Sequence, residues 1–172
     1  APIYSSAINR SNPNTFAKAK IQEANFIFLL SLLIVDGSDN TEYFIYKFNI
    51  SKKDQKRLKM VDKFYKEKIT ATSFSEKNLN KLFYFNGKEA VIDILSHELF
   101  CLKKVDKRLL NFINLFKSKV LPTMPVSAKI LMEKYNIPEG KTLGNKLKIA
   151  EEEWVNNNFK LSQKQISKII NR

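Results

Sequence analysis

Apolar side chains recur at intervals of three and four residues along most of the chain, with polar residues between them. This spacing is typical of amphipathic helices, because it gathers the apolar side chains on one face. Residues that interrupt helices are scarce, since the 172 residues include only four glycines and five prolines. No segment shows the strict alternation of a half-buried strand. The pattern therefore predicts an all-α fold, built as an irregular array of many helices.

Residues that favour helix starts and ends divide this pattern into separate helices. Ser51 is followed three residues later by Asp54, a variant of the capping box, and Ser75 and Asp106 precede further periodic segments. Gly87 and Pro122 interrupt the pattern. In chain order, we predict helices over about residues 16–35 and 42–48, a helix after Ser51, a helix from Ser75 to Gly87 and a helix over about residues 89–102. A helix from Asp106 to Pro122 and a short helix ending at Tyr135 follow. After the breaker at 138–140 we predict a long helix, and after Ser162 a short one.

The apolar run and the cysteine count argue against a membrane-spanning protein and against one stabilised by internal disulfides. The apolar run at residues 26–35 is ten residues long, whereas a membrane-spanning helix needs roughly 20. We therefore expect a buried helix, no membrane partner and a cytoplasmic protein. Cys101 is the single cysteine, so no internal disulfide can form, and its apolar neighbours predict a small buried side chain.

No group of residues can be interpreted as a catalytic or metal-binding site. His97 is the single histidine and lacks a second ligand at metal spacing, so we expect a surface residue or one with satisfied hydrogen bonds. Gly37-Ser38 resembles the Gly-Ser of a nucleotidyltransferase active site, but no Asp-x-Asp follows to bind magnesium, which favours a turn. The acidic run at 151–153 predicts a solvated helix face. We expect no catalytic residue, metal or cofactor in this chain.

Charge points toward a polyanionic partner. Lysine and arginine number 30 against 17 aspartates and glutamates, which gives a formal net charge of +13. A protein this basic attracts nucleic acid. A genome rich in A and T, which favours lysine and asparagine codons, would also produce part of this excess.

Two rows of basic residues concentrate the charge. In the helix after Ser51, four lysines recur at helical spacing and two further basic residues flank them: Lys52, Lys56, Lys59 and Lys63, with Lys53 and Arg57. Near the C-terminus, basic residues recur at every fourth position: Lys160, Lys164, Lys168 and Arg172. Such spacing places each row on one helix face, where like charges repel. Each row is either an RNA contact or a solvated face, and a ragged terminal helix would also explain the second.

Gly144 lies in the first turn of a predicted helix, where glycine costs up to ~1 kcal/mol relative to alanine. Either another backbone packs closely there, which is the commoner reason, or a phosphate approaches the free amide groups at the helix start. Gly140 precedes the helix, and Lys141 and Lys146 are placed to assist a phosphate. We therefore count all four residues as candidates for RNA binding.

The C-terminal quarter carries a family resemblance. Its residues include, in order, Met124-Pro125-Val126, Leu131, Gly140, Leu143-Gly144, Leu147, Trp154 and Asn158-Phe159. This order resembles the C-terminal region of bacterial class II tRNA nucleotidyltransferases, the CCA-adding enzymes. The segment Phe48-Asn49-Ile50-Ser51-Lys52-Lys53-Asp54, with Leu58 after it, is similar to their Leu-Arg-Leu-Ser-Asn segment. Together the resemblance covers roughly residues 25 to 162.

Some positions depart from the family pattern. Ser127 stands in place of a glycine, Ile130 in place of an aspartate and Lys141 in place of a proline. The family's catalytic head, with its Gly-Ser and Asp-x-Asp, is missing from these residues. The Glu-Asp-x-x-Arg motif of the family's neck is missing as well. The chain also begins with Ala1 rather than methionine, and we expect a fragment or a processed product.

The resemblance implies the body and tail of such an enzyme, with residues 1–121 as a body-like region and 122–172 as a tail-like region. It implies binding to the acceptor and T-arm region of tRNA, with the catalytic head and neck module as a further partner. Mg²⁺ and CTP or ATP would belong to that head and neck, so we expect this chain to be inert by itself. The same region of a bacterial poly(A) polymerase is an alternative, and so is a non-enzymatic helical scaffold that binds protein or DNA.

Overall fold

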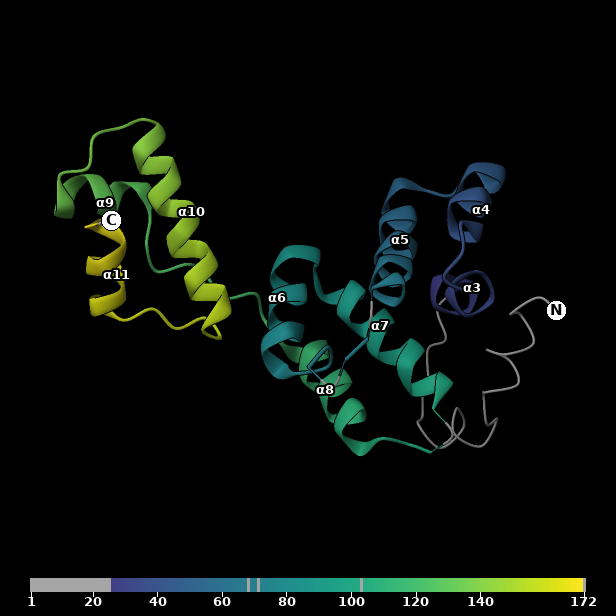
Figure 1. The fold of residues 1–172 in the computed structure, drawn as a ribbon. Coiled ribbons are helices and arrows are strands. Elements are labelled where there is room, and N and C mark those ends of the chain that lie inside the picture. The colour runs from purple at the N-terminus through teal and green to yellow at the C-terminus, as the bar shows by residue number, and fades with distance from the viewer. Residues whose placement is uncertain (1–25, 68, 71, 103, 172) are drawn as a thin grey trace.

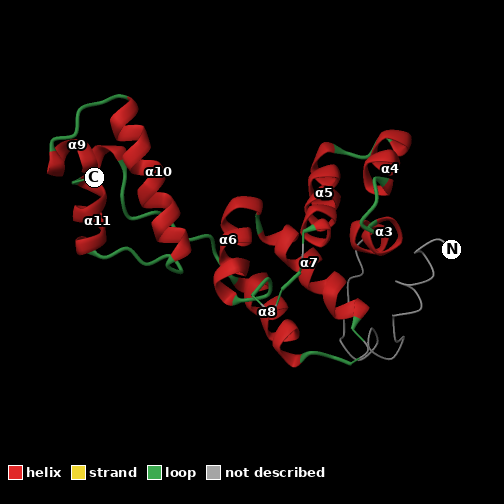
Figure 2. Cartoon of the chain, in the orientation of Figure 1, coloured by secondary structure: helices red, strands yellow, loops and turns green. Residues whose placement is uncertain are grey.

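The computed structural model describes residues 26–67, 69–70, 72–102 and 104–171, and within them the chain contains helices and no strand (Figures 1 and 2). The all-α prediction is confirmed. The helices are α3 (Phe26–Ile34), α4 (Asn40–Phe48), α5 (Lys52–Lys66), α6 (Glu76–Asn86), α7 (Lys88–Cys101), α8 (Lys107–Ser118), α9 (Ala128–Tyr135), α10 (Lys141–Asn156) and α11 (Gln163–Ile170).

Several helices begin at side chains that cap them. The hydroxyls of Ser51 and Ser75 accept the backbone N–H groups of Asp54 and Asn78, at 3.2 and 3.4 Å. Asp106 accepts the N–H of Arg108 at 2.7 Å. Ser162 forms a full capping box with Gln165. The helix starts predicted from these residues are confirmed, because a cap needs only a side chain and the backbone next to it.

Two predicted boundaries were wrong. The second helix begins at Asn40 rather than at residue 42. The helix after Asp106 ends at Ser118, before Pro122, because the chain becomes extended at Lys119. Of the predicted helix at 16–35, residues 16–25 lie outside the described part of the chain.

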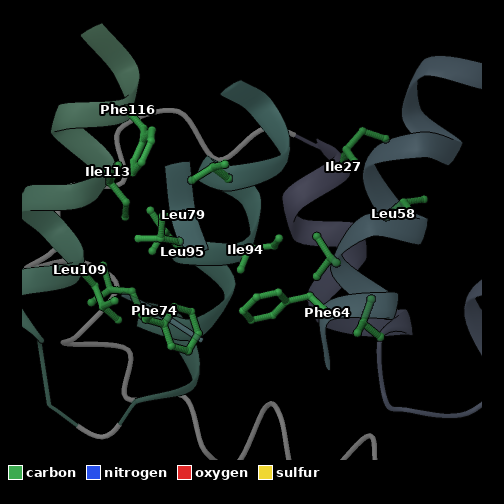
Figure 3. Close-up of a cluster of buried hydrophobic side chains, with 14 of the residues drawn as sticks. Ile27, Leu58, Phe64, Phe74, Leu79, Ile94, Leu95, Leu109, Ile113 and Phe116 are labelled. Carbon is green, nitrogen blue, oxygen red and sulfur yellow. The ribbon is translucent and has the colours of Figure 1, made fainter. Parts of the chain in front are cut away.

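The first hydrophobic core surrounds α7. Helices α3, α5, α6 and α8 all pack against α7, and its buried residues lie on more than one side, as expected for a central helix. Figure 3 shows side chains from these helices meeting in the core. Its buried members range from Ile27 in α3 to Phe116 in α8.

A second, smaller core lies in the C-terminal part. It joins Val126, Leu131 of α9, Ile137, Leu143 of α10 and Ile166 of α11. Helix α10 packs against both α9 and α11. The described residues therefore contain two hydrophobic clusters, one from residues 27–116 and one from residues 126–166.

Helix α10 also packs against α6, which connects the two parts (Figure 1). Trp154 is 2% exposed and its ring lies 5.5 Å from Tyr84 of α6 and 5.0 Å from Phe159. Trp154 is therefore a packing residue, with no surface open to RNA. The turn after α10 places Asn158 and Phe159 at positive φ angles of 52° and 63°, a rare conformation for a residue as large as phenylalanine.

Candidate nucleic-acid interface

Helix α5 presents the four lysines of the predicted row together with the flanking Lys53. All five are exposed, and none forms an ion pair with a carboxylate among the described residues: Lys52, Lys53, Lys56, Lys59 and Lys63. Four of them, with Gln55 and Met60, line a shallow groove of about 360 Å³. We call this surface the α5 basic face.

The orientation of the α5 basic face follows from the opposite side of the same helix. Leu58, Val61 and Phe64 are 0%, 1% and 8% exposed and lie in the first core. Burial of each such side chain contributes about 1.5–3 kcal/mol, which exceeds the few tenths of a kcal/mol that each repelling lysine pair costs. The core therefore fixes the rotation of α5, and the lysines must point toward solvent.

Arg57 behaves differently from the lysines around it. Its Nε and one terminal nitrogen each donate to Asp93 of α7 over 2.7 Å. The Asp93 side chain is 6% exposed. Burial raises the pKa of the Asp93 carboxyl against the effect of the guanidinium, while the hydrogen bonds to Asp93 raise the pKa of Arg57. Arg57 thus joins α5 to α7, and its bidentate donors are already occupied.

A second hollow lies where α5 meets the start of α7. It has a volume of about 110 Å³ and is lined by Lys53, Lys56 and Met60 of α5 together with Asn86 and Glu89. Lys56 and Met60 line both this hollow and the groove. The α5 basic face is therefore a hollowed surface with cations on its rim.

The glycines at the start of α10 have an open environment. A Cβ atom at Gly140 or Gly144 would meet no atom within 4 Å. The explanation of Gly144 by a closely packed backbone is therefore wrong. Gly140 has a φ of 141°, and this backbone conformation favours glycine on its own. Lys141 is exposed at the first position of the helix.

Lys146 caps the C-terminus of α11. Its ammonium donates to the backbone carbonyls of Ile169 and Ile170, over 3.3 and 2.6 Å. These carbonyls lie at the helix end, where they have no partner within the helix and where the dipole favours a cation. The contact ties α10 to α11, and it occupies the charge that we considered for a phosphate.

The C-terminal row is only partly helical. Lys164 and Lys168 are exposed on α11, whereas Ile166 and Ile169 are buried. Lys160 is also exposed but precedes the helix, which begins at Gln163. The structure therefore gives two lysines one turn apart rather than a continuous row, and Arg172 lies outside the described residues.

Residues outside the basic rows differ from prediction in two places. His97 is 4% exposed and its Nε2 has no hydrogen-bond partner among the described residues, so the expectation of a surface or satisfied histidine was wrong. Glu151 accepts a hydrogen bond of 2.5 Å from the Tyr84 hydroxyl, so only part of the acidic run is a solvated face. Gly37-Ser38 does form a turn, in which Asp36 accepts the Ser38 N–H at 2.9 Å.

The sequence does not predict Asp93 as the partner of Arg57. The two residues are 36 positions apart, and an aspartate in an apolar helical segment was the one available signal. The described residues contain no cluster of three or more potential metal ligands. None of the described helices is both long and apolar enough to cross a membrane. Comparison with protein-family models and with curated proteins finds no match to this chain.

Proposed function

We propose that this chain is the RNA-binding body and tail of a CCA-adding tRNA nucleotidyltransferase, and that the α5 basic face contacts the backbone of the tRNA acceptor and T-arm. The observation that carries the proposal is the set of five exposed lysines on one helix, none of which forms an ion pair with a described carboxylate. The identity of the RNA and of the parent enzyme in this proposal comes from the resemblance of residues 121–159 to the CCA-adding enzymes.

The chemistry of the face suits a folded RNA. Lysine ammonium groups act as mobile point charges that pair with phosphates and read no base sequence. Duplex RNA is recognised mainly through its shape, its phosphates and its 2′-hydroxyls. Because Arg57 is held by Asp93, the proposed contact consists of lysines alone. In the parent enzyme, nucleotide addition with Mg²⁺ and CTP or ATP would belong to the head and neck.

A charge-reversal variant tests the proposed contact. Changing Lys52, Lys56, Lys59 and Lys63 together to glutamate is expected to abolish tRNA binding and to leave the helical circular dichroism spectrum unchanged. The wild-type chain should bind with a salt dependence of about 3–5 ion contacts in the log–log plot. A matched variant reverses four other exposed lysines: Lys47, Lys104, Lys107 and Lys148. Equal affinities of the two variants would remove the α5 basic face from the proposal.

The choice of RNA partner has its own test. A minihelix containing only the acceptor and T-arm should bind the wild-type chain as tightly as whole tRNA. An anticodon hairpin, a DNA duplex of equal length and heparin should bind more weakly. Equal binding of all these polyanions would indicate a merely basic scaffold, and the tRNA part of the proposal would fail.

A further inference from the structure

A polar hollow lies where the two parts of the molecule meet. It has a volume of about 400 Å³ and is bounded by Glu67 at the end of α5, the loop at residues 72–75, the first two turns of α6 and Asn156 of α10. Figure 1 shows α6 between α10 on one side and α7 on the other. The hollow therefore has walls from both the first core region and the C-terminal region.

Internal hydrogen bonds hold the loop wall of this hollow. The Thr70 N–H donates to the Ser73 hydroxyl at 2.9 Å, and the Asn78 side-chain amide donates to the Ser73 carbonyl at 2.8 Å. The Ser75 hydroxyl accepts the Asn78 N–H. A ligand would meet a preorganised wall, so little conformational entropy is lost on binding.

Three donors around the hollow are unused. Lys77 and Lys81 lie one turn apart on α6 and are exposed, and the Asn156 amide is exposed on α10. None of the three side chains has a hydrogen bond or ion pair with another described residue. Glu67 is the one carboxylate among the lining residues. The surplus of donors and positive charge favours an anion that accepts several hydrogen bonds, as a phosphate does.

The hollow continues the α5 basic face. Glu67 is the C-cap residue of α5, and its N–H donates to the carbonyl of Lys63, the last lysine of the row, at 3.1 Å. The row from Lys52 to Lys63 therefore leads directly to the rim of the hollow. An elongated polyanion that lies along this row would extend over Lys77 and Lys81.

We propose that this hollow binds a backbone phosphate of the same RNA that lies on the α5 basic face, through Lys77, Lys81 and Asn156. The inference rests on the proposed RNA-binding function and extends it to residues outside the two basic rows found in the sequence. Because Asn156 comes from α10 and the lysines come from α6, the RNA would contact both parts of the molecule at once.

Salt-dependent tRNA titrations of two double variants test the inference. Lys77→Gln with Lys81→Gln is expected to weaken tRNA binding roughly tenfold and to lower the salt slope by about 1, because the contact with one phosphate is lost. The matched control changes Lys104, in the loop before α8, and Lys107, the first residue of α8, to glutamine, which removes the same charge at exposed positions. The control should keep the wild-type slope. Thermal unfolding of both variants should match that of the wild type.

A third variant tests the contribution of α10. Asn156→Asp places a second carboxylate in the lining and should weaken binding while leaving the fold intact. If the Lys77/Lys81 variant binds as the Lys104/Lys107 control does, and the α5 charge reversal still abolishes binding, this inference is wrong and the proposed function stands. If the wild-type chain does not bind tRNA at all, both fail together.

Discussion

His97 is a neutral imidazole enclosed between α5 and α7. The Tyr65 ring lies 4.4 Å from the imidazole centroid, the Cys101 sulfur lies 3.8 Å from Nδ1, and Tyr65 donates to Glu98 rather than to the histidine. Burial lowers the pKa of His97 from 6.5 to about 4. Protonation would place a charge on a ring whose Nε2 has no partner among the described residues.

This shift predicts a pH dependence of stability. Below pH 6.5 His97 becomes protonated in the unfolded chain, whereas in the folded chain it becomes protonated only near pH 4. The contribution of His97 to the free energy of unfolding is therefore complete above pH 6.5 and is lost as the pH falls toward 4, by up to about 3 kcal/mol. Urea denaturation at a series of pH values measures this loss.

Acidic residues also titrate in the lower part of this range, so the informative quantity is a difference between two proteins. His97→Leu removes the titrating group and keeps an apolar side chain in the site. The wild type should lose more stability than this variant between pH 6.5 and 4.5. Parallel curves would show that His97 is accessible to protons in the folded state.

At the scale of the element, α10 combines an unusual start with a second glycine. Gly140 precedes the helix with a φ of 141°, whereas Gly144 lies within the helix, is exposed and has open space around the position of a Cβ. Gly144 therefore lowers the stability of α10 without a packing benefit in the described structure.

Gly144→Ala is expected to stabilise the protein by about 0.5–1 kcal/mol, because alanine loses less backbone entropy than glycine when the helix forms. Chemical denaturation gives the change in the free energy of unfolding. Gly140→Ala is the matched comparison and should destabilise, since an L-residue is strained at the φ of Gly140. Destabilisation by both substitutions would restore the explanation by close packing.

The elements also show which features local sequence determines. Ser51, Ser75, Asp106 and Ser162 identify helix starts because their caps bond to backbone within three residues. The lysine row of α5 could likewise be predicted, since helical spacing fixes which residues share a face.

Contacts between distant segments were not predictable in this way. Arg57 and Lys146 are basic residues in basic surroundings, and their partners lie 36 and 23–24 positions away. Asn156 lines the same hollow as Lys77 and Lys81, because α10 packs against α6. No periodic pattern relates Asn156 to the two lysines, so the sequence predicts the α5 basic face but not the polar hollow.

At the scale of the molecule, the two hydrophobic cores of the described residues meet at a junction that contains a small polar network. Asn80 of α6 is 1% exposed and donates to the Asn158 side chain at 3.2 Å, while Lys119 donates to Asn80 at 2.5 Å. The Lys119 ammonium also lies 5.0 Å from the Phe116 ring centroid and 5.8 Å from that of Phe159, and burial lowers its pKa. One amide thus connects α6, the end of α8 and the turn after α10.

If this amide holds the parts together, Asn80→Ala should separate their unfolding. The substitution leaves Lys119 and Asn158 without their partner and is expected to cost about 1–3 kcal/mol. Trp154 is the single tryptophan and lies at the junction, so its fluorescence reports on contact between the parts while circular dichroism reports on all helices. In Asn80→Ala, the fluorescence should shift to the red at a lower urea concentration than the loss of helix, whereas the two transitions coincide in a cooperative wild type.

Asn111→Ala, at an exposed position of α8, serves as the control with coincident transitions. Coincident transitions and unchanged stability in Asn80→Ala would mean that the aromatic contacts of Tyr84, Trp154 and Phe159 hold the junction without the polar network.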